Sequence, residues 1–152
     1  MILQPEIATA LEEARARTLA LLDPIPESDL MRQHSTLMSP LVWDLAHIGH
    51  YEELWLLRAI ANAPPTDARF DDVYDAFRHP RAERPTLDLL GPTEARDFLA
   101  DVRKRALDVL GDIPFDGDDP LLDAGFVYGM VLRHEHQHDE TLLATIDLIE
   151  NG

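Results

Sequence analysis

The sequence predicts an all-α protein, a four-helix bundle with a long connection between its second and third helices. Two observations carry this prediction. Four segments repeat apolar residues at the three- and four-residue spacing of an amphipathic helix, and no segment alternates apolar and polar residues as a half-buried strand does. Proline, glycine and capping residues separate the four segments, so each begins and ends as its own helix. Such helices with one long crossover are typical of a four-helix bundle.

The first predicted helix spans about 5–22 and the second about 40–63. "DPIPES" ends the first, because two closely spaced prolines cannot continue a helix. At the start of the second, Ser39 can cap the free backbone N–H groups and Pro40 suits the first helical position. "NAPPTD" ends it. The connection that follows, 64–92, is too long for a simple turn, and long loops are commonly functional.

The third predicted helix spans about 93–111, and Gly111 is a natural C-terminal stop. Its expected inward positions are Phe98, Leu99, Val102, Ala106 and Leu110. The fourth predicted helix opens at Asp119 and Pro120, a capping residue followed by proline, and continues to about 149.

Length and composition restrict the class of protein. A chain of 152 residues has the size of one domain with its own core. The absence of cysteine excludes disulfides, zinc fingers and thiolate-ligated clusters, so a metal site must use histidine nitrogen and carboxylate oxygen. Acidic residues outnumber basic ones 29 to 13, and the formal charge of −16 disfavours a nucleic-acid partner. Without a signal-peptide pattern or a long apolar run, we expect a soluble cytoplasmic protein with no membrane partner.

Three of the seven histidines lie in the stretch "RHEHQHDE" at 133–140. Residues four apart on a helix are offset by only about 40°, and residues two apart by about 200°. His134 and His138 therefore share a face, while His136 points nearly the opposite way. The apolar stripe that continues the face of the pair consists of Val127, Val131, Leu142, Thr145 and Ile149. A lone core histidine is more often simply hydrogen-bonded, but a same-face pair at this spacing can converge on one metal ion.

A third ligand is expected from the second helix, whose "WDLAHIGHYEELW" contains two histidines. The inward line of that helix favours His47, although His50 lies three residues on and is adjacent on the helix surface. His34 and His79 lie outside the long helices and are interpreted as loop contacts. Three imidazoles leave coordination positions open, which indicates chemistry or substrate binding rather than a closed structural site.

Other residues of the two histidine motifs have simpler interpretations. Asp44, Asp139 and Glu140 can in principle orient the ligand imidazoles, but a solvated role is expected for each. Phe126, like the other aromatic residues at helical spacing, is expected in the core.

The two motifs together resemble a known family. "MSPLVWDLAHIGHYEELWLLR" and "GMVLRHEHQHDETLLATI", with "RQHS" before them and "YDAFRHPRAER" between them, are similar to the N-terminal DinB-like domain of ergothioneine-biosynthesis sulfoxide synthases. The resemblance covers nearly the whole chain, and the paired motifs are specific together and weaker separately. It implies a DinB-like four-helix bundle in which 1–152 form a single metal-binding domain.

The resemblance also implies a mononuclear non-haem Fe(II) site held by His47, His134 and His138. The reaction it implies is oxidative C–S bond formation, in which O₂ couples the thiol of γ-glutamylcysteine, or of cysteine in some members, to the imidazole of Nα-trimethylhistidine (hercynine) and gives a sulfoxide. Three histidines leave three octahedral positions open, enough for thiolate, imidazole and O₂. Neutral ligands also keep the metal Lewis-acidic, which favours an anionic thiolate.

A thiol substrate that carries a carboxylate needs a cationic partner in this acidic chain. Arg81 and Arg84 in "HPRAERP" are the candidates, and the resemblance suggests that a loop arginine in this region contacts the thiol substrate. We favour Arg84; the alternative is that both are ordinary solvated arginines. The resemblance places the family's catalytic tyrosine in a larger C-terminal domain outside 1–152, in cis or in trans. The catalytic donor is therefore not assigned within this chain, and we expect half of an active site.

Two other hypotheses use the same histidines. One is a stand-alone DinB-like thiol transferase that activates a small thiol with Zn²⁺ or another divalent metal. The other is a metal-binding interaction module without turnover of its own. Because the ligand set is the same in all three, only the bound metal and the length of the natural reading frame separate them.

Overall fold

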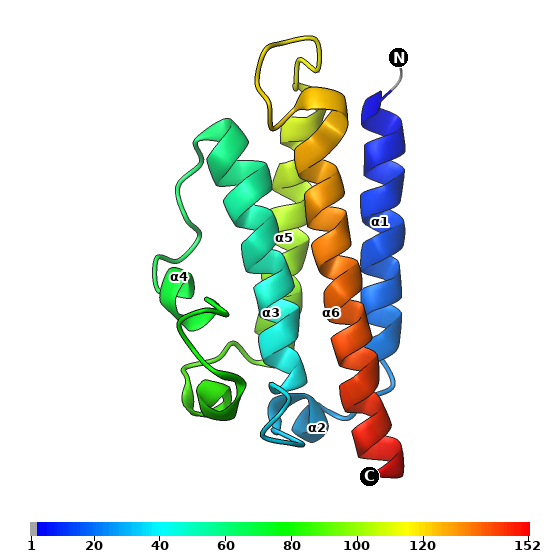
Figure 1. The fold of residues 1–152 in the computed structure, drawn as a ribbon, viewed down its shortest axis with the longest axis vertical. Coiled ribbons are helices and arrows are strands. Elements are labelled where there is room, and N and C mark those ends of the chain that lie inside the picture. Colours follow the sequence, from blue (N-terminus) through cyan, green and yellow to red (C-terminus); the bar gives the residue numbers. More distant parts are fainter. Residues whose placement is uncertain (1–2) are drawn as a thin grey trace.

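The computed structural model describes residues 3–152 and shows an all-helical bundle, which confirms the predicted fold class. Four long helical columns run side by side (Figure 1). They are α1 (Leu3–Leu22), α3 (Leu41–Glu52) continued by the π-helical segment η1 (Glu53–Ala59), α5 (Pro92–Gly111) and α6 (Phe126–Asn151). The short elements are α2 (Glu27–Met31), α4 (Phe70–Val73), η2 (Arg81–Thr86) and η3 (Asp123–Gly125). Residues 3–152 contain no strand.

Helix α3 is the most enclosed of the four columns. Every residue from 41 to 50 is buried, because α3 packs against α5 on one side and α6 on another. Gly49 permits the close approach to α5, since a Cβ atom there would lie 2.5 Å from Leu99 Cδ1. Side chains on α3 are therefore held firmly, and those that face α6 can meet it at short range.

The start of the fourth long helix differs from the sequence-based prediction. The helix begins at Phe126 and not at Asp119. Asp119 caps only a single turn, in which its carboxylate accepts the Leu121 N–H. Ala124 (φ 50°) and Gly125 (φ 75°) then adopt left-handed conformations, which interrupt any right-handed helix. Phe126 consequently lies at the first turn, where it is 52 % exposed, so its assignment to the core was wrong.

The cap predicted for the second long helix is also wrong. The first helical residue is Leu41, Pro40 precedes it, and no side chain caps the free N–H groups. Ser39 is buried, and its hydroxyl oxygen accepts a hydrogen bond from Arg84 instead. The start of α3 is therefore tied to the long connection rather than closed by its own capping residue.

The long connection between η1 and α5 folds back onto α3, as Figure 1 shows for α4. The Trp43 indole donates to the Val73 carbonyl at 3.0 Å. Arg58 donates to both carboxylate oxygens of Asp71 at 2.7 and 3.2 Å. These contacts place the connection beside the buried half of α3. Among residues 3–152, no helix combines the length and the apolar character of a membrane span.

Candidate metal centre

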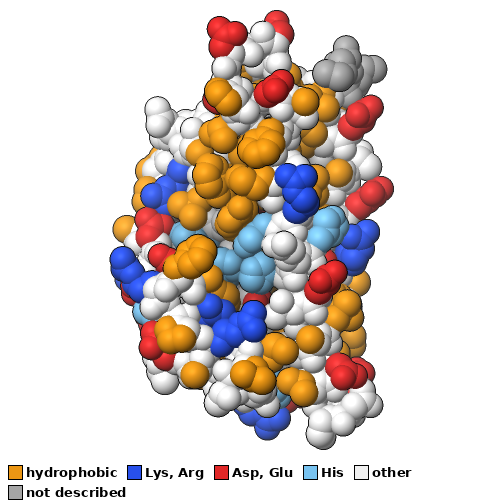
Figure 2. All heavy atoms as spheres, in the orientation of Figure 1, with side chains coloured by type: hydrophobic (Ala, Val, Ile, Leu, Met, Phe, Trp, Pro, Cys, Tyr) orange, Lys and Arg blue, Asp and Glu red, His pale blue; other side chains and the backbone are white. Residues whose placement is uncertain are grey.

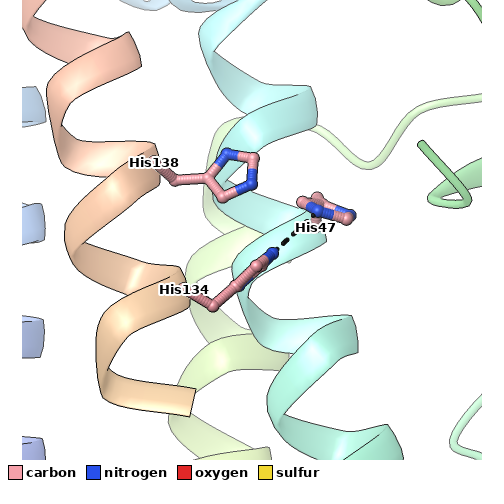
Figure 3. A group of neighbouring side chains, drawn as sticks. All are labelled: His47, His134 and His138. Carbon is pink, nitrogen blue, oxygen red and sulfur yellow. Dashed lines mark hydrogen bonds between the residues drawn. The ribbon is translucent and has the colours of Figure 1, made fainter. Parts of the chain in front are cut away.

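The structure brings three histidines from two helices together. His47 comes from α3, His134 and His138 come from α6, and all three rings point into the space between the helices (Figure 3). One ring nitrogen from each lies within 4.8 Å of the others. His134 and His138 share a face because they are four residues apart on α6, and α3 packs against that face. These are the three residues that the sequence analysis selects.

Burial keeps at least two of these imidazoles neutral. The pKa of His47 is lowered to about 3, mainly by burial and next by electrostatic repulsion from His138. The pKa of His134 is lowered to about 2, again mainly by burial and then by repulsion from the other two rings. Neutral imidazole is the form that donates a lone pair to a metal.

The arrangement of the ring nitrogens fits a bound cation. The Nε2 atoms of His47 and His134 face each other at 3.1 Å. The Nδ1 atom of His47 carries its proton, because it donates to the Tyr74 carbonyl at 2.8 Å, so the lone pair of His47 lies on Nε2. Lone pairs that converge at this distance need a proton or a cation between them. An all-imidazole set suits Fe, Zn and other borderline divalent metals.

Each ring is held by a different neighbour. His47 stacks on Trp43 with ring centroids 4.6 Å apart and an interplanar angle of 15°. His134 stacks on Tyr51 at 3.7 Å and 10°. The Nδ1 atom of His138 lies 3.1 Å from Asp44 Oδ1. Hydrogen bonds and stacking of this kind fix ring orientation before any metal binds.

The carboxylates near the histidine motifs differ in their positions. Asp44 is only 2 % exposed and contacts His138, so the expected solvated role for it was wrong. Asp139 is also buried, but its Oδ1 lies 2.7 Å from the Thr18 hydroxyl, on the side of α6 away from the three histidines. Glu140 is exposed, as expected.

The remaining histidines have other partners. His50 is buried, and its Nε2 lies 2.8 Å from Asp71 Oδ1 in the long connection. His136 is exposed, with its Nδ1 3.2 Å from Arg17. His34 contacts a backbone carbonyl, and His79 contacts two carboxylates of its own loop. His50, the alternative ligand from the second helix, therefore links α3 to the connection.

A cavity of about 620 Å³ opens onto the three histidines. Its other lining residues include Tyr51, Leu54, Trp55, Tyr74 and Phe77. Figure 2 shows the histidines at the centre of one face, with an apolar patch above them and basic side chains below. Phe77 stands fully exposed at the cavity. The cavity is large enough for molecules of the size of amino acids and dipeptides. In the structure of residues 3–152, its apolar lining is open to solvent.

Neither candidate substrate arginine lines this cavity. Arg84 is buried and donates to the backbone carbonyls of His79 and Ala76 and to the Ser39 hydroxyl. Arg81 is exposed and donates to one backbone carbonyl at 3.0 Å. Arg84 therefore holds the connection in shape, whereas the Arg81 guanidinium retains more free donors.

A buried ionic cluster lies on the other side of the ligand helices, and sequence reasoning missed it. Glu52 follows the ligand-bearing part of α3, and Glu135 follows His134 on α6. Arg15 from α1 lies 3.1 Å from each of these carboxylates, and Arg103 from α5 lies 2.8 Å from Glu52. All four residues are at most 7 % exposed. The available signal was Arg15 within the apolar stripe of the first helix.

Comparison with known proteins agrees with this picture. Residues 10–142, which include all three histidines, match the sequence model of the DinB superfamily. The chain is 50 % identical over 145 residues to a hercynine oxygenase of Mycolicibacterium thermoresistibile, with 94 % of this chain and 31 % of the relative covered. A hercynine oxygenase of Mycobacterium tuberculosis is 49 % identical over 145 residues, with 94 % and 32 % covered.

A third relative, the hercynine oxygenase of Mycolicibacterium smegmatis, is 48 % identical over 152 residues, with 99 % of this chain and 34 % of the relative covered. The chain thus spans about a third of the length of the curated relatives it matches. The fold, the histidine site and the match over 10–142 lead to one conclusion: the chain belongs to the DinB superfamily.

Proposed function

We propose that His47, His134 and His138 hold one non-haem Fe(II), and that the chain is the metal-binding domain of an ergothioneine-biosynthesis sulfoxide synthase. The observation that carries the proposal is the set of three ring nitrogens within 4.8 Å, in a chain 48–50 % identical to proteins named hercynine oxygenase. The proposed reaction uses O₂ to join the thiol of γ-glutamylcysteine, or of cysteine, to the imidazole of hercynine.

The residues of this chain would perform the binding part of that reaction. Fe(II) held by three neutral ligands would supply open coordination positions and the redox chemistry that O₂ requires. The Tyr74 carbonyl and the stacked rings of Trp43 and Tyr51 orient the imidazoles. The cavity beside them would confine the thiol and hercynine next to the metal, which converts an encounter of several molecules into a reaction within one site.

We propose that the rest of the active site lies outside these residues. Tyr51 lines the cavity, but its ring is stacked flat on His134. The Tyr74 hydroxyl accepts the Leu90 N–H, and Tyr128 is fully buried. A proton donor and most contacts to hercynine are therefore assigned to the two thirds of the relatives' length that this chain does not span, in cis or in trans.

Iron stoichiometry tests the ligand set. His47→Ala, His134→Ala and His138→Ala should each lose most of the bound Fe(II) after anaerobic reconstitution. His136→Ala is the matched control, because His136 lies in the same motif and is exposed toward Arg17. Equal iron loss in His136→Ala would contradict the assignment. Metal analysis after anaerobic purification separates iron from the zinc expected of a thiol transferase.

Catalytic turnover tests the proposal that residues 1–152 form only half of the active site. Residues 1–152 supplied with Fe(II), O₂, γ-glutamylcysteine and hercynine should form no sulfoxide detectable over several turnovers by mass spectrometry. The reason is that bound reactants still need a placed proton donor. Robust multiple turnover would refute the half-site, and Tyr51→Phe would then be the first variant to examine.

We propose further that an arginine of the 81–84 segment pairs with a carboxylate of the thiol substrate. The sequence favours Arg84, but Arg84 donates two hydrogen bonds to its own loop and one to Ser39, which supports Arg81 as the freer group. Binding of γ-glutamylcysteine to the iron-loaded protein, measured by calorimetry for Arg81→Gln and Arg84→Gln, tests both. Loss of affinity in Arg81→Gln with an unchanged melting temperature would identify Arg81. Unchanged affinity in both variants would remove both residues from the substrate site.

A further inference from the structure

We propose that Asp44 is a positioning residue of the metal centre, whose carboxylate holds the His138 imidazole with its proton on Nδ1 and its lone pair on Nε2. The inference rests on the proposed metal centre and adds a residue beyond the three histidines. It also ranks those histidines, because Asp44 contacts only one of them.

The geometry places Asp44 for this role. It lies one turn before His47 on α3, and its Oδ1 is 3.1 Å from His138 Nδ1. A carboxylate only accepts hydrogen bonds, so the contact requires the proton on Nδ1. The second oxygen, Oδ2, is buried and has no hydrogen-bond partner within residues 3–152. The carboxylate is thus buried with His138 as its one hydrogen-bonded neighbour in the described chain.

A buried cation helps to balance the Asp44 charge. Burial lowers the pKa of Arg84, and electrostatic attraction to Asp44 opposes that effect. The Arg84 guanidinium lies 3.8 Å above the Trp43 ring and is fixed by its hydrogen bonds to the connection. Asp44 therefore interacts electrostatically with a fixed cation and contacts the His138 imidazole through Oδ1. A hydrogen bond from imidazole to a carboxylate is stronger than one to a neutral acceptor.

The three imidazoles are consequently unequal. His138 donates to a charged oxygen of Asp44, and His47 donates to the neutral carbonyl of Tyr74. For His134 the contact that fixes the ring is the stacked Tyr51, and within residues 3–152 its Nδ1 has no hydrogen-bond acceptor. An anionic acceptor makes an imidazole a stronger donor than a neutral acceptor does. His138 is therefore the strongest of the three ligands and His134 the weakest.

The competing explanation is purely structural. Asp44 lies in the first turn of α3, where a negative charge stabilises a helix through its dipole. That role predicts lower stability when Asp44 is replaced. It predicts no change in the proton position on His138 and no change in metal affinity.

Proton positions can be read directly in the metal-free protein. Two-bond ¹H–¹⁵N correlation spectra of histidine-labelled protein at pH 8 should show His138 and His47 protonated on Nδ1. In Asp44→Leu, the His138 signals should shift toward the Nε2-protonated form while those of His47 stay in place. A wild-type His138 protonated on Nε2 would overturn the proposal, whether or not any variant folds.

Metal affinity gives the second readout. Anaerobic titration with Co(II), followed by its visible absorption, should show Kd raised about 10–100-fold in Asp44→Leu. Asp44→Asn keeps an acceptor oxygen but loses the charge, so its Kd should rise less. Glu53→Gln is the matched control, because Glu53 is a buried carboxylate of the same helical column that binds Thr66 and no histidine. It should lose stability and keep wild-type affinity.

The outcomes separate the two proposals. A folded Asp44→Leu protein with wild-type Co(II) affinity would overturn the role of Asp44. A wild-type protein that binds neither Co(II) nor Fe(II) would count against the metal centre itself. The spectra of the metal-free protein still test Asp44 in that case.

Discussion

Helices α3 and α6 carry the histidine site on one side and the buried ionic cluster on the other, and the two sides accommodate buried polar groups differently. Toward the cavity, burial lowers the pKa values of His47 and His134 so that both are neutral, and their Nε2 atoms face each other at 3.1 Å. Toward α1 and α5, Glu52 and Glu135 are paired with two arginines. The carboxylates of the ionic cluster have guanidinium partners within the bundle, whereas the histidine site presents imidazole rings to a cavity.

The contrast between the ionic cluster and the histidine site indicates which buried polar groups mark a functional site in a helical bundle. Buried charges that satisfy one another hold helices in place and need nothing from outside. Buried imidazoles with strongly lowered pKa values beside a cavity indicate a candidate functional site. Adjacent residues of α6 belong to the two different sides: His134 is part of the histidine site, and Glu135 is part of the ionic cluster.

The largest effect should come from opening the cluster. Glu52→Ala removes the acceptor shared by Arg15 and Arg103 and should lower the free energy of unfolding by about 3–5 kcal/mol, because buried guanidinium groups are left without a partner. In the metal-free protein, His134→Ala should cost at most about 1 kcal/mol. Urea unfolding measures both. Equal losses would mean that the two sides do not differ as proposed.

Metal should stabilise the histidine side by simple linkage. A divalent metal at about 100 times its Kd should add about 2.7 kcal/mol to the stability of the folded state. His134→Ala should abolish most of that gain, and His136→Ala should retain it. Circular dichroism of the chelated protein should still show a helical fold, because the core and the ionic cluster do not involve the metal. A random coil after chelation would contradict this.

Lowering the pH should reduce the contribution of the metal-free histidine site to the stability of the fold. The pKa values of His47 and His134 in the folded protein, about 3 and about 2, lie below the ordinary value of 6.5. The unfolded chain therefore takes up protons first, so the stabilising contribution is complete above pH 6.5 and falls as the pH drops toward 3. At pH 5.5, each of the two rings should lower the free energy of unfolding by roughly 1 kcal/mol relative to its value above pH 6.5. The double variant His47→Gln/His134→Gln should show a flatter profile between pH 7.5 and 5.5, measured by urea unfolding.

The smallest effect should come from an exposed basic residue close to the cluster in sequence. Arg17 lies two residues after Arg15 on α1, and its side-chain hydrogen-bond partner within residues 3–152 is the exposed His136. Arg17→Ala should change stability by about 0.5 kcal/mol or less, as is usual for surface contacts. Arg15→Ala is the comparison and should cost several times more. Similar thermal melting of the two variants would show that burial does not control the difference.

Much of the fold is predictable from spacing alone. The apolar stripes identify the four long helices because burial imposes the helical period on the sequence. The start of α6 was predicted wrongly because Asp119 and Pro120 carry the right capping signal, and only the left-handed pair Ala124 and Gly125 shows that the turn is separate. Ser39 has the chemistry of a cap but contacts Arg84, a partner 45 residues away.

The candidate site shows the same limit. Helical geometry alone selects the pair His134 and His138 and favours His47 over His50, and the family resemblance implies the same three residues. The contacts that hold the rings depend on tertiary docking, because the Tyr74 carbonyl reaches His47 only when the long connection folds back. The ionic cluster could not be predicted from residue spacing either, because the helical pattern is identified from apolar residues and a buried arginine does not fit it.

The hydrogen bond between His47 and the Tyr74 carbonyl makes the long connection part of the ligand support. Whenever the connection lifts from α3, His47 loses the acceptor that fixes its proton, Trp43 loses the Val73 carbonyl, and Arg84 loses the Ser39 hydroxyl. Opening of the connection and release of the proposed metal are therefore expected to be linked. A loaded site should slow hydrogen exchange and proteolytic cleavage throughout residues 70–84, so the surface of this loop would report the occupancy of a centre buried beneath it.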